Sequence, residues 1–364
     1  MSFIKKYIER ETINRRKFLL SGAAGVTAAG LMRPGLARAA ENPTIAWSYR
    51  NRTNPYWNSV VSGGEAFVKS LDMPADALTH LISDGSSEKS LADVKALLSK
   101  EGGNVALAID ANDAPNARPV VEAVTEAGGF VTTMWNKTDD LHPWDFGDNY
   151  VAHLSWSDVA PAEKMARVMF EAMGGKGRIV GIGGIASNVP AIERNQGLMN
   201  VLQEFPDIEL LDYQPADWDT QKANEVMSGF LTRFGDVDGV FCANDSMAFG
   251  AVEALRADGL AGEIPVSGYD GTPQGVELVM KGEMSGTVST DPFWGGGVLA
   301  SLAYHAAIGT FKPSEEPEEH REFYGPAVDI TLANAEEYKA NNIDKEPEYD
   351  WTDFWGPTNG QIQY

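Results

Sequence analysis

Cysteine, histidine and long apolar runs are scarce in the 364-residue sequence. The single cysteine, Cys242, allows no intrachain disulfide, and its place within an apolar run predicts a small buried side chain. Five histidines are scattered along the chain, at His80, His142, His153, His305 and His320. Neither they nor the cysteine have the spacing of a metal site, so we expect no metal ion and no cofactor. No apolar run of about 20 residues follows position 39, which excludes a transmembrane helix in that part of the sequence.

Basic residues are also scarce, with 29 Lys and Arg against 52 Asp and Glu and a net charge of -23. Residues 1–39 carry eight of the basic and two of the acidic side chains, so without them the net charge falls to -29. A surface this acidic repels phosphate backbones and anionic lipid headgroups. Nucleic acids and membrane surfaces are therefore not expected as partners.

The first 39 residues are typical of a targeting segment rather than of a folded domain. Arg15 and Arg16 precede a short apolar stretch, and Ala37 and Ala39 provide the small residues of an A-x-A cleavage pattern. This arrangement resembles a twin-arginine export signal. The apolar stretch, residues 18–32, is shorter than the about 20 residues that a membrane anchor needs. We therefore expect a signal peptide over residues 1–39, cleaved near Ala39, and a mature protein in a bacterial periplasm.

Strand-like apolar runs alternate with helical patterns from residue 44 onward. The runs are TIAW (44–47), VALAID (105–110), FVTTMW (130–135), GRIVGIGG (177–184), GVFCA (239–243) and IPVSGYD (264–270). Continuous apolar strands separated by helices are typical of parallel sheets that are covered on both faces. The predicted fold class is therefore α/β with parallel sheets.

An internal sequence similarity predicts two similar lobes. Residues 108–128 and 240–259 share the order strand, Ala-Asn-Asp, helix. In each copy the aspartate, Asp113 or Asp245, is expected to cap the N-terminus of its helix. Two βαβ halves of the same design indicate two Rossmann-like lobes. The tail from about residue 334 shows no clear period.

Residues that follow the predicted strands are candidate site residues, because ligands of open parallel sheets bind at the carboxyl ends of the strands. They are Asn54, Tyr56, Trp57, Asp110, Asn112, Trp135 and Asn136 in the first half, and Arg194, Trp218, Asn244 and Asp270 in the second. Such side chains suit a small polyhydroxylated ligand, whose hydroxyls both donate and accept charge-assisted hydrogen bonds of about 1.5–3 kcal/mol each. The C–H faces of a sugar pack on aromatic rings, so Tyr56 and Trp57 are expected to face Trp218 across the ligand.

Four stretches resemble a known family. They are GIGGIASNVPAIERNQGLMNVL (181–202), YQPADWDTQKANEVM (213–227), VFCANDSMAFGAVEAL (240–255) and VSGYDGTPQGVELV (266–279). Over roughly residues 44–330 the chain resembles type I periplasmic binding proteins of the ribose-binding group, the ligand-capturing components of ABC sugar importers. The resemblance implies two lobes that close on a ligand about a three-segment hinge, a membrane permease as partner, and a monomer.

The resemblance also implies boundaries for the lobes. Residues 40–154 plus 291–322 would form the N-terminal lobe, and 155–290 plus 323–364 the C-terminal lobe with an extended tail. The three hinge crossings are expected near residues 154–158, 290–291 and 320–328.

The resemblance assigns a role to each candidate. Asn54, Tyr56 and Trp57 match an Asn-Pro-aromatic-aromatic stretch, Arg194 matches a guanidinium that binds ring oxygen and hydroxyls, Trp218 matches a stacking aromatic, and Asn244 and Asp270 match hydroxyl-binding groups. Asp110 lies where ribose binders have Asn, and Thr290 lies near their hinge Gln. Glu193 is expected to orient Arg194. Arg194→Ala is expected to lose at least about 1.5 kcal/mol of ligand affinity with little change in fold.

One departure from the family concerns the residues after the third strand. Ribose binders have an Asp-Arg pair there, and this chain has Trp135 and Asn136. The exchange removes two charges and adds a large apolar face. We therefore expect a pentose variant, a deoxy sugar, a sugar alcohol or a cyclitol rather than ribose.

Two alternative functions follow from other features. GIGGIA (181–186) has the dinucleotide-binding pattern G-x-G-x-x-A, which favours an exported NAD(P)-dependent oxidoreductase. Pro190 suits a wider turn than a phosphate-binding one, and Asp212 lies about 30 residues on rather than about 20. No general acid or base is evident, so we expect binding rather than catalysis. A periplasmic sensor subunit for a sugar-like signal is the second alternative.

Overall fold

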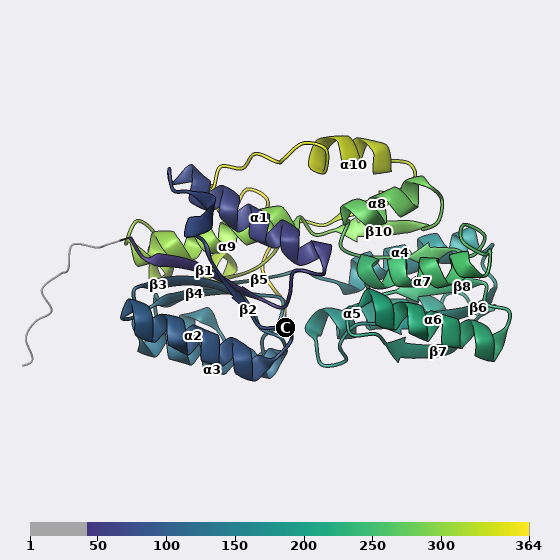
Figure 1. Cartoon of the computed structure of the whole chain (residues 1–364), viewed down its shortest axis with the longest axis horizontal. Coiled ribbons are helices and arrows are strands. Elements are labelled where there is room, and N and C mark those ends of the chain that lie inside the picture. The colour runs from purple at the N-terminus through teal and green to yellow at the C-terminus, as the bar shows by residue number, and fades with distance from the viewer. Residues whose placement is uncertain (1–41, 364) are drawn as a thin grey trace, which may run out of the picture. The chain divides into compact units, whose positions relative to one another are not determined.

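Two α/β lobes make up residues 42–363, the part of the chain that the structure, a computed structural model, describes (Figure 1). Both lobes are built on largely parallel sheets, which confirms the predicted fold class. The predicted export signal and its cleavage near Ala39 lie outside the described residues. No helix within residues 42–363 combines the length and the apolar character that a membrane crossing requires.

The first lobe has a six-stranded sheet in the order β11-β5-β4-β3-β1-β2, with every pairing parallel. Its strands are β1 (Thr44–Tyr49), β2 (Thr79–Ile82), β3 (Val105–Asp110), β4 (Phe130–Met134), β5 (Tyr150–Ser155) and β11 (Glu322–Tyr324). Its helices are α1 (Pro55–Ser70), α2 (Ser87–Glu101), α3 (Ala114–Glu126) and α9 (Pro292–Ala307). One face of the sheet packs on α1 and α9 and the other on α2 and α3, so both faces are buried.

The second lobe has a six-stranded sheet in the order β12-β10-β9-β8-β6-β7, in which only β12 runs antiparallel to its neighbour. Its strands are β6 (Gly177–Gly183), β7 (Ile208–Pro215), β8 (Gly239–Cys242), β9 (Val266–Ser267), β10 (Gly286–Ser289) and β12 (Val328–Thr331). Its helices are α4 (Val159–Ala172), α5 (Val189–Leu202), α6 (Thr220–Phe234), α7 (Asp245–Ala257), α8 (Pro273–Met280) and α10 (Ala335–Asn342). Cys242 is buried in this core as a free thiol, as its apolar surroundings in the sequence predict.

Three short segments connect the lobes. Residues 156–158 lead from β5 to α4, residues 290–291 lead from β10 to α9, and residues 325–327 lead from β11 to β12. All three lie within or beside the crossings that the family resemblance implies. Because each segment is only two or three residues long, rotation of the lobes would be concentrated in a few backbone torsions.

The two Ala-Asn-Asp stretches differ in helix register. Asp113 caps α3 as predicted, and its Oδ1 accepts a hydrogen bond from Asn116 N at 3.0 Å. The same prediction for Asp245 is wrong, because Asn244 is the N-cap and α7 starts at Asp245. The buried Asp245 carboxylate instead accepts hydrogen bonds from the hydroxyls of Thr272 and Thr287, and so ties the N-cap of α8 and strand β10 to the helix.

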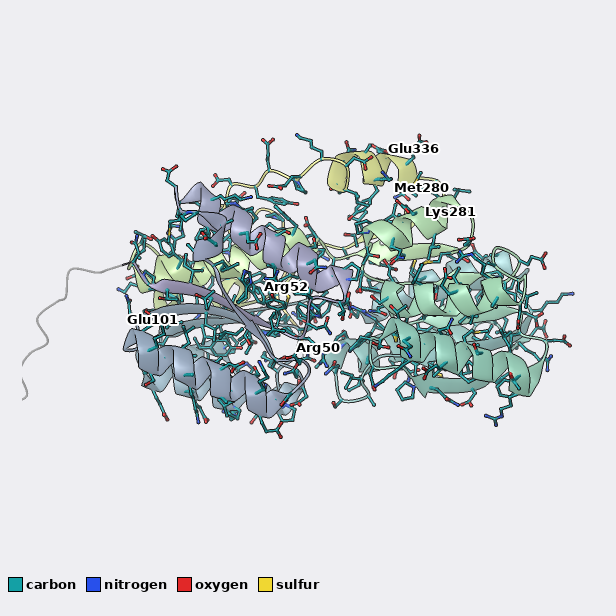
Figure 2. The ribbon with its side chains drawn as sticks, viewed as in Figure 1. Arg50, Arg52, Glu101, Met280, Lys281 and Glu336 are labelled. Carbon is teal, nitrogen blue, oxygen red and sulfur yellow. The ribbon has the colours of Figure 1, made fainter. Side chains whose placement is uncertain are left out.

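The C-terminal tail crosses between the lobes, which corrects its expected place in the second lobe. Helix α10 packs on α8, near Met280 and Glu336 in Figure 2. The chain then returns to the first lobe, where Trp351 is buried in the core formed by α1 and α9. A side chain at Gly297 would collide with the Trp351 ring, so the glycine makes room for the indole. Sequence periodicity could not reveal this packing, because it depends on one aromatic residue meeting one distant glycine.

Candidate ligand-binding cleft

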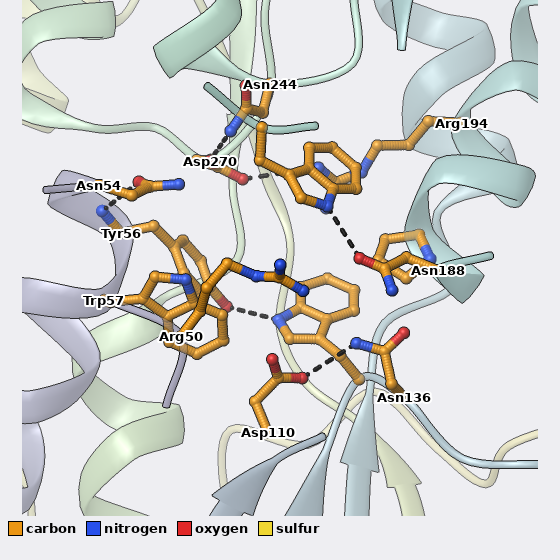
Figure 3. A pocket seen from close by; sticks show the side chains of 13 residues that line it. Arg50, Asn54, Tyr56, Trp57, Asp110, Asn136, Asn188, Arg194, Asn244 and Asp270 are labelled. Atoms are coloured by element: carbon orange, nitrogen blue, oxygen red, sulfur yellow. Dashed lines mark hydrogen bonds and ion pairs between the residues drawn. The ribbon is translucent and has the colours of Figure 1, made fainter. Parts of the chain in front are cut away.

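A cavity of about 430 Å³ lies between the lobes, at the carboxyl ends of strands from both sheets (Figure 3). Its lining consists of Arg50, Asn54, Tyr56, Trp57, Asp110, Trp135, Asn136, Asn188, Pro190, Arg194, Trp218, Asn244 and Asp270. The structure thus brings together ten of the twelve candidate residues named from the sequence, Asn112 and Thr290 being the other two.

The first wall of the cavity is formed by aromatic residues at the start of α1. Asn54 is the N-cap of this helix, and its Oδ1 accepts a hydrogen bond from Tyr56 N at 2.9 Å. Pro55 occupies the first turn, where a missing N–H costs nothing. The cap fixes the direction of the helix, so Tyr56 and Trp57 lie edge to face with ring centroids 5.2 Å apart. This arrangement explains the aromatic pair at a strand-to-helix turn.

Trp135 extends the aromatic wall toward the hinge. Its backbone has a left-handed φ of 57°, a conformation that costs energy for a large side chain. The ring is held on both sides, since its Nε1 donates to Tyr56 Oη at 2.9 Å and its centroid lies 4.3 Å from that of Trp156. Two aromatic partners and a hydrogen bond thus keep the strained residue in one orientation.

Asp110 and Asn136 form the polar floor of the first lobe. Asn136 Nδ2 donates to Asp110 Oδ1 at 3.1 Å and to the carbonyl oxygen of Ala111 at 3.0 Å. Burial raises the pKa of Asp110 to about 7, although the nearby positive charge of Arg50 acts in the opposite direction. The carboxyl group is therefore close to half-protonated at neutral pH and can both donate to and accept from a ligand hydroxyl.

Arg194, on the first turns of α5, is held by the second lobe itself. Its Nε donates to Asp158 Oδ2 at 2.9 Å, its Nη1 donates to the carbonyl oxygen of Ala243 at 2.9 Å, and Nη1 lies 3.5 Å from Asp270 Oδ1. Burial alone would lower the pKa of Arg194, but the carboxylates of Asp158 and Asp270 raise it above its usual value. Nη2 makes no hydrogen bond to any described residue, so it is the guanidinium nitrogen available to a ligand.

Asp158 and Glu193 support this arginine from behind. Asp158 is fully buried, and its second carboxylate oxygen accepts a hydrogen bond from Tyr269 Oη at 2.5 Å. The Arg194 guanidinium carbon lies 3.6 Å from the centroid of the same tyrosine ring. Glu193 makes its hydrogen bond to Asp158 N, at 3.0 Å, and not to Arg194. Its influence on the arginine is therefore indirect, through the position of Asp158.

Trp218 forms the wall of the second lobe. Asp217 and Trp218 both have left-handed backbones, with φ of 54° and 65°, which turn the indole into the cleft. A Cβ on Gly184 would lie 2.1 Å from the Trp218 ring, so only glycine fits beneath it. The indole Nε1 donates to Asn188 Oδ1 at 2.8 Å. Two strained residues, a glycine and a hydrogen bond therefore fix one orientation of this ring.

Asn244 and Asp270 complete the polar side of the second lobe. Asn244 Oδ1 accepts from Met247 N at 2.9 Å as the cap of α7, while its Nδ2 donates to Asp270 Oδ2 at 3.3 Å. Burial raises the pKa of Asp270 well above its usual value, with Arg194 opposing the shift and Asp245 and Asp158 adding to it. The carboxyl group is thus poorly solvated and gains from any hydroxyl that donates to it.

The structure does not bring Thr290 to the surface of the cavity. The residue is fully buried in the second crossing, and its hydroxyl has no hydrogen-bond partner of ordinary geometry among the described residues. It is the first residue of the crossing from β10 to α9 and is not among the residues that line the cavity. The residue would influence a ligand through the hinge backbone rather than by direct contact.

Sequence reasoning missed Arg50, Asn188 and Pro190. Arg50 directly follows β1 and extends into the space between the lobes (Figure 2), and its Nη2 donates to the Asn112 carbonyl oxygen at 2.9 Å. The strand-end rule applies to Arg50 as much as to Asn54, so this residue could have been proposed. Asn188 and Pro190 follow a loop instead of a strand end, and no local signal marks them.

The glycines of the 181–186 stretch serve packing. A Cβ on Gly181 or Gly183 would lie within 2.6 Å of the Tyr213 ring, and Gly184 lies beneath Trp218. The N-terminus of α5 beyond them faces the Asn136 side chain, whose Oδ1 accepts from Val189 N at 3.2 Å. Aromatic packing therefore explains these glycines without a bound phosphate. Within residues 42–363 no group of three or more His, Cys, Asp and Glu is arranged to hold a metal ion.

Comparison with known proteins places the chain in one family. Residues 45–310 match the family described as periplasmic binding protein domain. The chain is 30% identical over 267 residues to the ribose import binding protein of Salmonella typhimurium, covering 73% of this chain and 86% of that one. It is 29% identical over 267 residues to the D-allose-binding periplasmic protein of Escherichia coli, covering 73% and 84%.

A solved structure extends the likeness to nearly the whole described chain. It is a twin-arginine translocation pathway signal protein from Burkholderia phytofirmans, 45% identical, with a TM-score of 0.86 over 89% of this chain and 100% of that one. The family match, the two relatives and this structure agree with the resemblance carried by the sequence motifs. The chain therefore belongs to the type I periplasmic binding proteins of the ribose-binding type.

Proposed function

We propose that the protein is the solute-binding component of an ABC importer and captures one small sugar, sugar alcohol or cyclitol. The observation that carries the proposal is the cavity itself, which has indole and phenol rings on two sides and carboxylate, amide and guanidinium groups between them. Aromatic rings pack on the C–H faces of such a ligand, and the polar groups bind its hydroxyls. Relatives that bind ribose and D-allose support this ligand class.

The charges around the cavity favour a neutral ligand. Arg50 and Arg194 line it together with Asp110 and Asp270, so cationic and acidic groups are equal in number. Arg194 is already paired with the buried carboxylates of Asp158 and Asp270. An anionic ligand would have to compete with those carboxylates, and a cationic one would approach a buried guanidinium at close range. A polyol meets neither difficulty.

The residues after β4 argue against ribose as the preferred ligand. Trp135 and Asn136 replace the Asp-Arg pair of ribose binders and line the cavity in the first lobe. The indole enlarges the apolar wall next to Tyr56, and it packs on Trp156 with ring centroids 4.3 Å apart. A pentose variant, a deoxy sugar, a sugar alcohol or a cyclitol presents more C–H surface to this wall. The ligand-binding residues we propose are the ten candidates named from the sequence that line the cavity, with Thr290 acting through the hinge.

Capture would be reversible and would involve no chemical step. Both lobes contribute to the cavity, so a ligand makes its full set of contacts only in the closed form and shifts the population toward it. The closed form would present both lobes to a membrane permease. We further propose that the protein acts as a monomer in the periplasm, after removal of residues 1–39, and that it neither catalyses a reaction nor binds nucleic acid.

A thermal-shift screen tests the proposal. Residues 40–364 are heated with pentoses, hexoses, deoxy sugars, sugar alcohols and cyclitols, and with NAD and NADP as the alternative ligands. A compound that binds only the folded protein raises the unfolding midpoint through mass action. We expect one stereochemical series to raise the midpoint and Trp218→Ala to reduce the shift at the same ligand concentration. A shift with a nicotinamide nucleotide alone would favour the oxidoreductase instead.

A further inference from the structure

Helix α5 starts without a cap from its own N-cap residue. At the corresponding positions of α1 and α7, Asn54 and Asn244 each accept a hydrogen bond from a backbone N–H of the same helix at 2.9 Å. Asn188 is the N-cap of α5, yet its side chain makes no such bond. Asparagine is favoured at this position because of that bond. An unused cap indicates that the Asn188 side chain is needed elsewhere.

The two ends of the Asn188 amide contact different lobes. Its Nδ2 donates to the carbonyl oxygen of Asn112, in the first lobe, at 2.8 Å. Its Oδ1 accepts from Trp218 Nε1, in the second lobe, at 2.8 Å. The side chain is 2% exposed, so both bonds are shielded from water. Figure 3 shows Asn188 among the side chains that line the cavity.

The first lobe also supplies the cap that α5 lacks. Val189 N, the first N–H of the helix, donates to Asn136 Oδ1 at 3.2 Å. Pro190 follows and has no N–H that needs a partner. The same Asn136 side chain donates to Asp110 in its own lobe at 3.1 Å. The first N–H of α5 therefore has its protein partner in the other lobe, and parting the lobes would leave it to water.

We propose that these contacts form a closure latch, consisting of Asn188, Asn136, Val189 N and the Asn112 carbonyl, and that Asn188 is the positioning residue for Trp218. The latch joins the lobes directly, so it holds a measurable share of the protein closed without any sugar. The inference rests on the proposed ligand-binding role of the cleft. It adds that closure of the lobes helps to hold the Trp218 ring in place, because the Asn188 amide contacts both this ring and the first lobe.

The latch sets an expected size for the effect of a substitution. Each neutral hydrogen bond between the lobes changes the closed-to-open ratio by about 2- to 10-fold. Asn188→Ala removes both bonds of the amide. Asn188→Asp keeps an acceptor for Trp218 Nε1 but loses the donor to the Asn112 carbonyl. Asn195→Asp, on the same helix and outside the cavity, makes the same change of charge and serves as the matched control.

The first experiment measures the distance between the lobes without sugar. Spin labels are placed on exposed positions of α2 and α6, as Lys95→Cys and Ser228→Cys, with the buried Cys242 left unchanged. Burial raises the pKa of the Cys242 thiol, which keeps it unreactive. Double electron–electron resonance should show a closed and an open population in the wild type. The ratio should fall 2- to 10-fold in Asn188→Ala, at least as much in Asn188→Asp, and not in Asn195→Asp.

The second experiment follows the indole N–H of Trp218 by NMR. Trp218→Phe removes its signal and so assigns it. We expect Asn188→Ala to shift this signal upfield and Asn188→Asp to leave it hydrogen-bonded. A merely structural role of Asn188 as a helix cap would instead lower the thermal midpoint and leave the distance ratio unchanged.

An unchanged ratio in both Asn188 variants, or a wild type with only the open distance, would overturn the latch. An indole signal that does not move in Asn188→Ala would overturn the positioning of Trp218. Neither experiment uses a sugar. Failure of the proposed function in the thermal-shift screen is therefore distinguishable from failure of the latch.

Discussion

Arg194→Ala should destabilise the second lobe as well as weaken ligand binding. The Arg194 side chain is 4% exposed and is the cationic partner of Asp158 and Asp270, whose side chains are 0% and 6% exposed. Removing one member of a buried ionic group leaves the others without compensation, at a cost of about 3–5 kcal/mol. The sequence-based expectation of little change in fold is therefore replaced by a loss of that size in the free energy of unfolding at pH 8.

The loss should depend on pH. Burial raises the pKa of Asp158 and of Asp270, and Arg194 opposes both shifts, so both pKa values rise further in the variant. A carboxyl group whose folded pKa is raised binds more protons in the native state than in the unfolded state. Its contribution to stability is present below the unfolded pKa and is lost as pH rises through the folded pKa. The deficit of Arg194→Ala should thus be smaller at pH 5 than at pH 8.

Urea unfolding followed by circular dichroism at the two pH values measures this deficit. Arg167→Ala is the matched control, because Arg167 pairs with Glu204 on the surface and an exposed pair contributes little. The double variant Arg194→Ala with Asp158→Asn should recover part of the loss, since it removes one of the two uncompensated carboxylates. A loss of less than about 1 kcal/mol for Arg194→Ala, or one equal at both pH values, would refute the reasoning.

Three further predictions follow from the cleft and the tail. Burial raises the pKa of Asp110 to about 7, so the wild type loses stability as the pH rises toward that value. Between pH 4 and pH 8, Asp110→Asn should lose roughly 4 kcal/mol less unfolding free energy than the wild type, as measured by urea unfolding. An identical dependence of unfolding free energy on pH in the two proteins would contradict the pKa shift. Trp351→Ala empties a site packed against Gly297 and should cost about 3–5 kcal/mol of unfolding free energy in the same assay; a cost near zero would contradict the docking of the tail. Trp218→Ala removes one wall of the cavity and should raise the Kd of the sugar found by the screen about 3- to 10-fold by calorimetry, whereas an unchanged Kd would exclude stacking on this ring.

The sequence predicts those site residues whose location depends only on their place at the end of a strand. The alternation of apolar strands with helices identifies the strands. Parallel strands must end at one edge of their sheet, so Asn54 and Asp110 converge in the first lobe, and Asn244 and Asp270 in the second, whatever the details of packing. The aromatic residues after β1 and β4 follow the same rule. The strand-end rule does not predict the orientation of Trp218, because that orientation depends on two residues with left-handed backbones and on the glycine beneath the ring.

The remaining features depend on contacts that no local pattern encodes. Asn188 looks like an ordinary helix cap, and only the neighbouring lobe shows that its amide is used between lobes. Asp245 was expected to be a cap because the helix start was placed one residue late, an error that propensities cannot correct. The sequence places Asp158 only within a predicted hinge crossing, yet in the structure it is the main partner of Arg194.

The position of the C-terminal end matters for attaching labels or tags to the protein. Gln361 pairs with Phe323 beside the third crossing, and Gln363 lines a cavity together with Trp135 of the first lobe and Val189 and Glu193 of the second. In Figure 1 the C-terminal end of the described chain accordingly lies at the boundary between the lobes. A fluorophore attached there would change its surroundings whenever the lobes separate, which makes this end a natural place for an optical sensor. For the same reason, a purification tag fused there would obstruct the boundary between the lobes and bias every ligand affinity measured with the tagged protein.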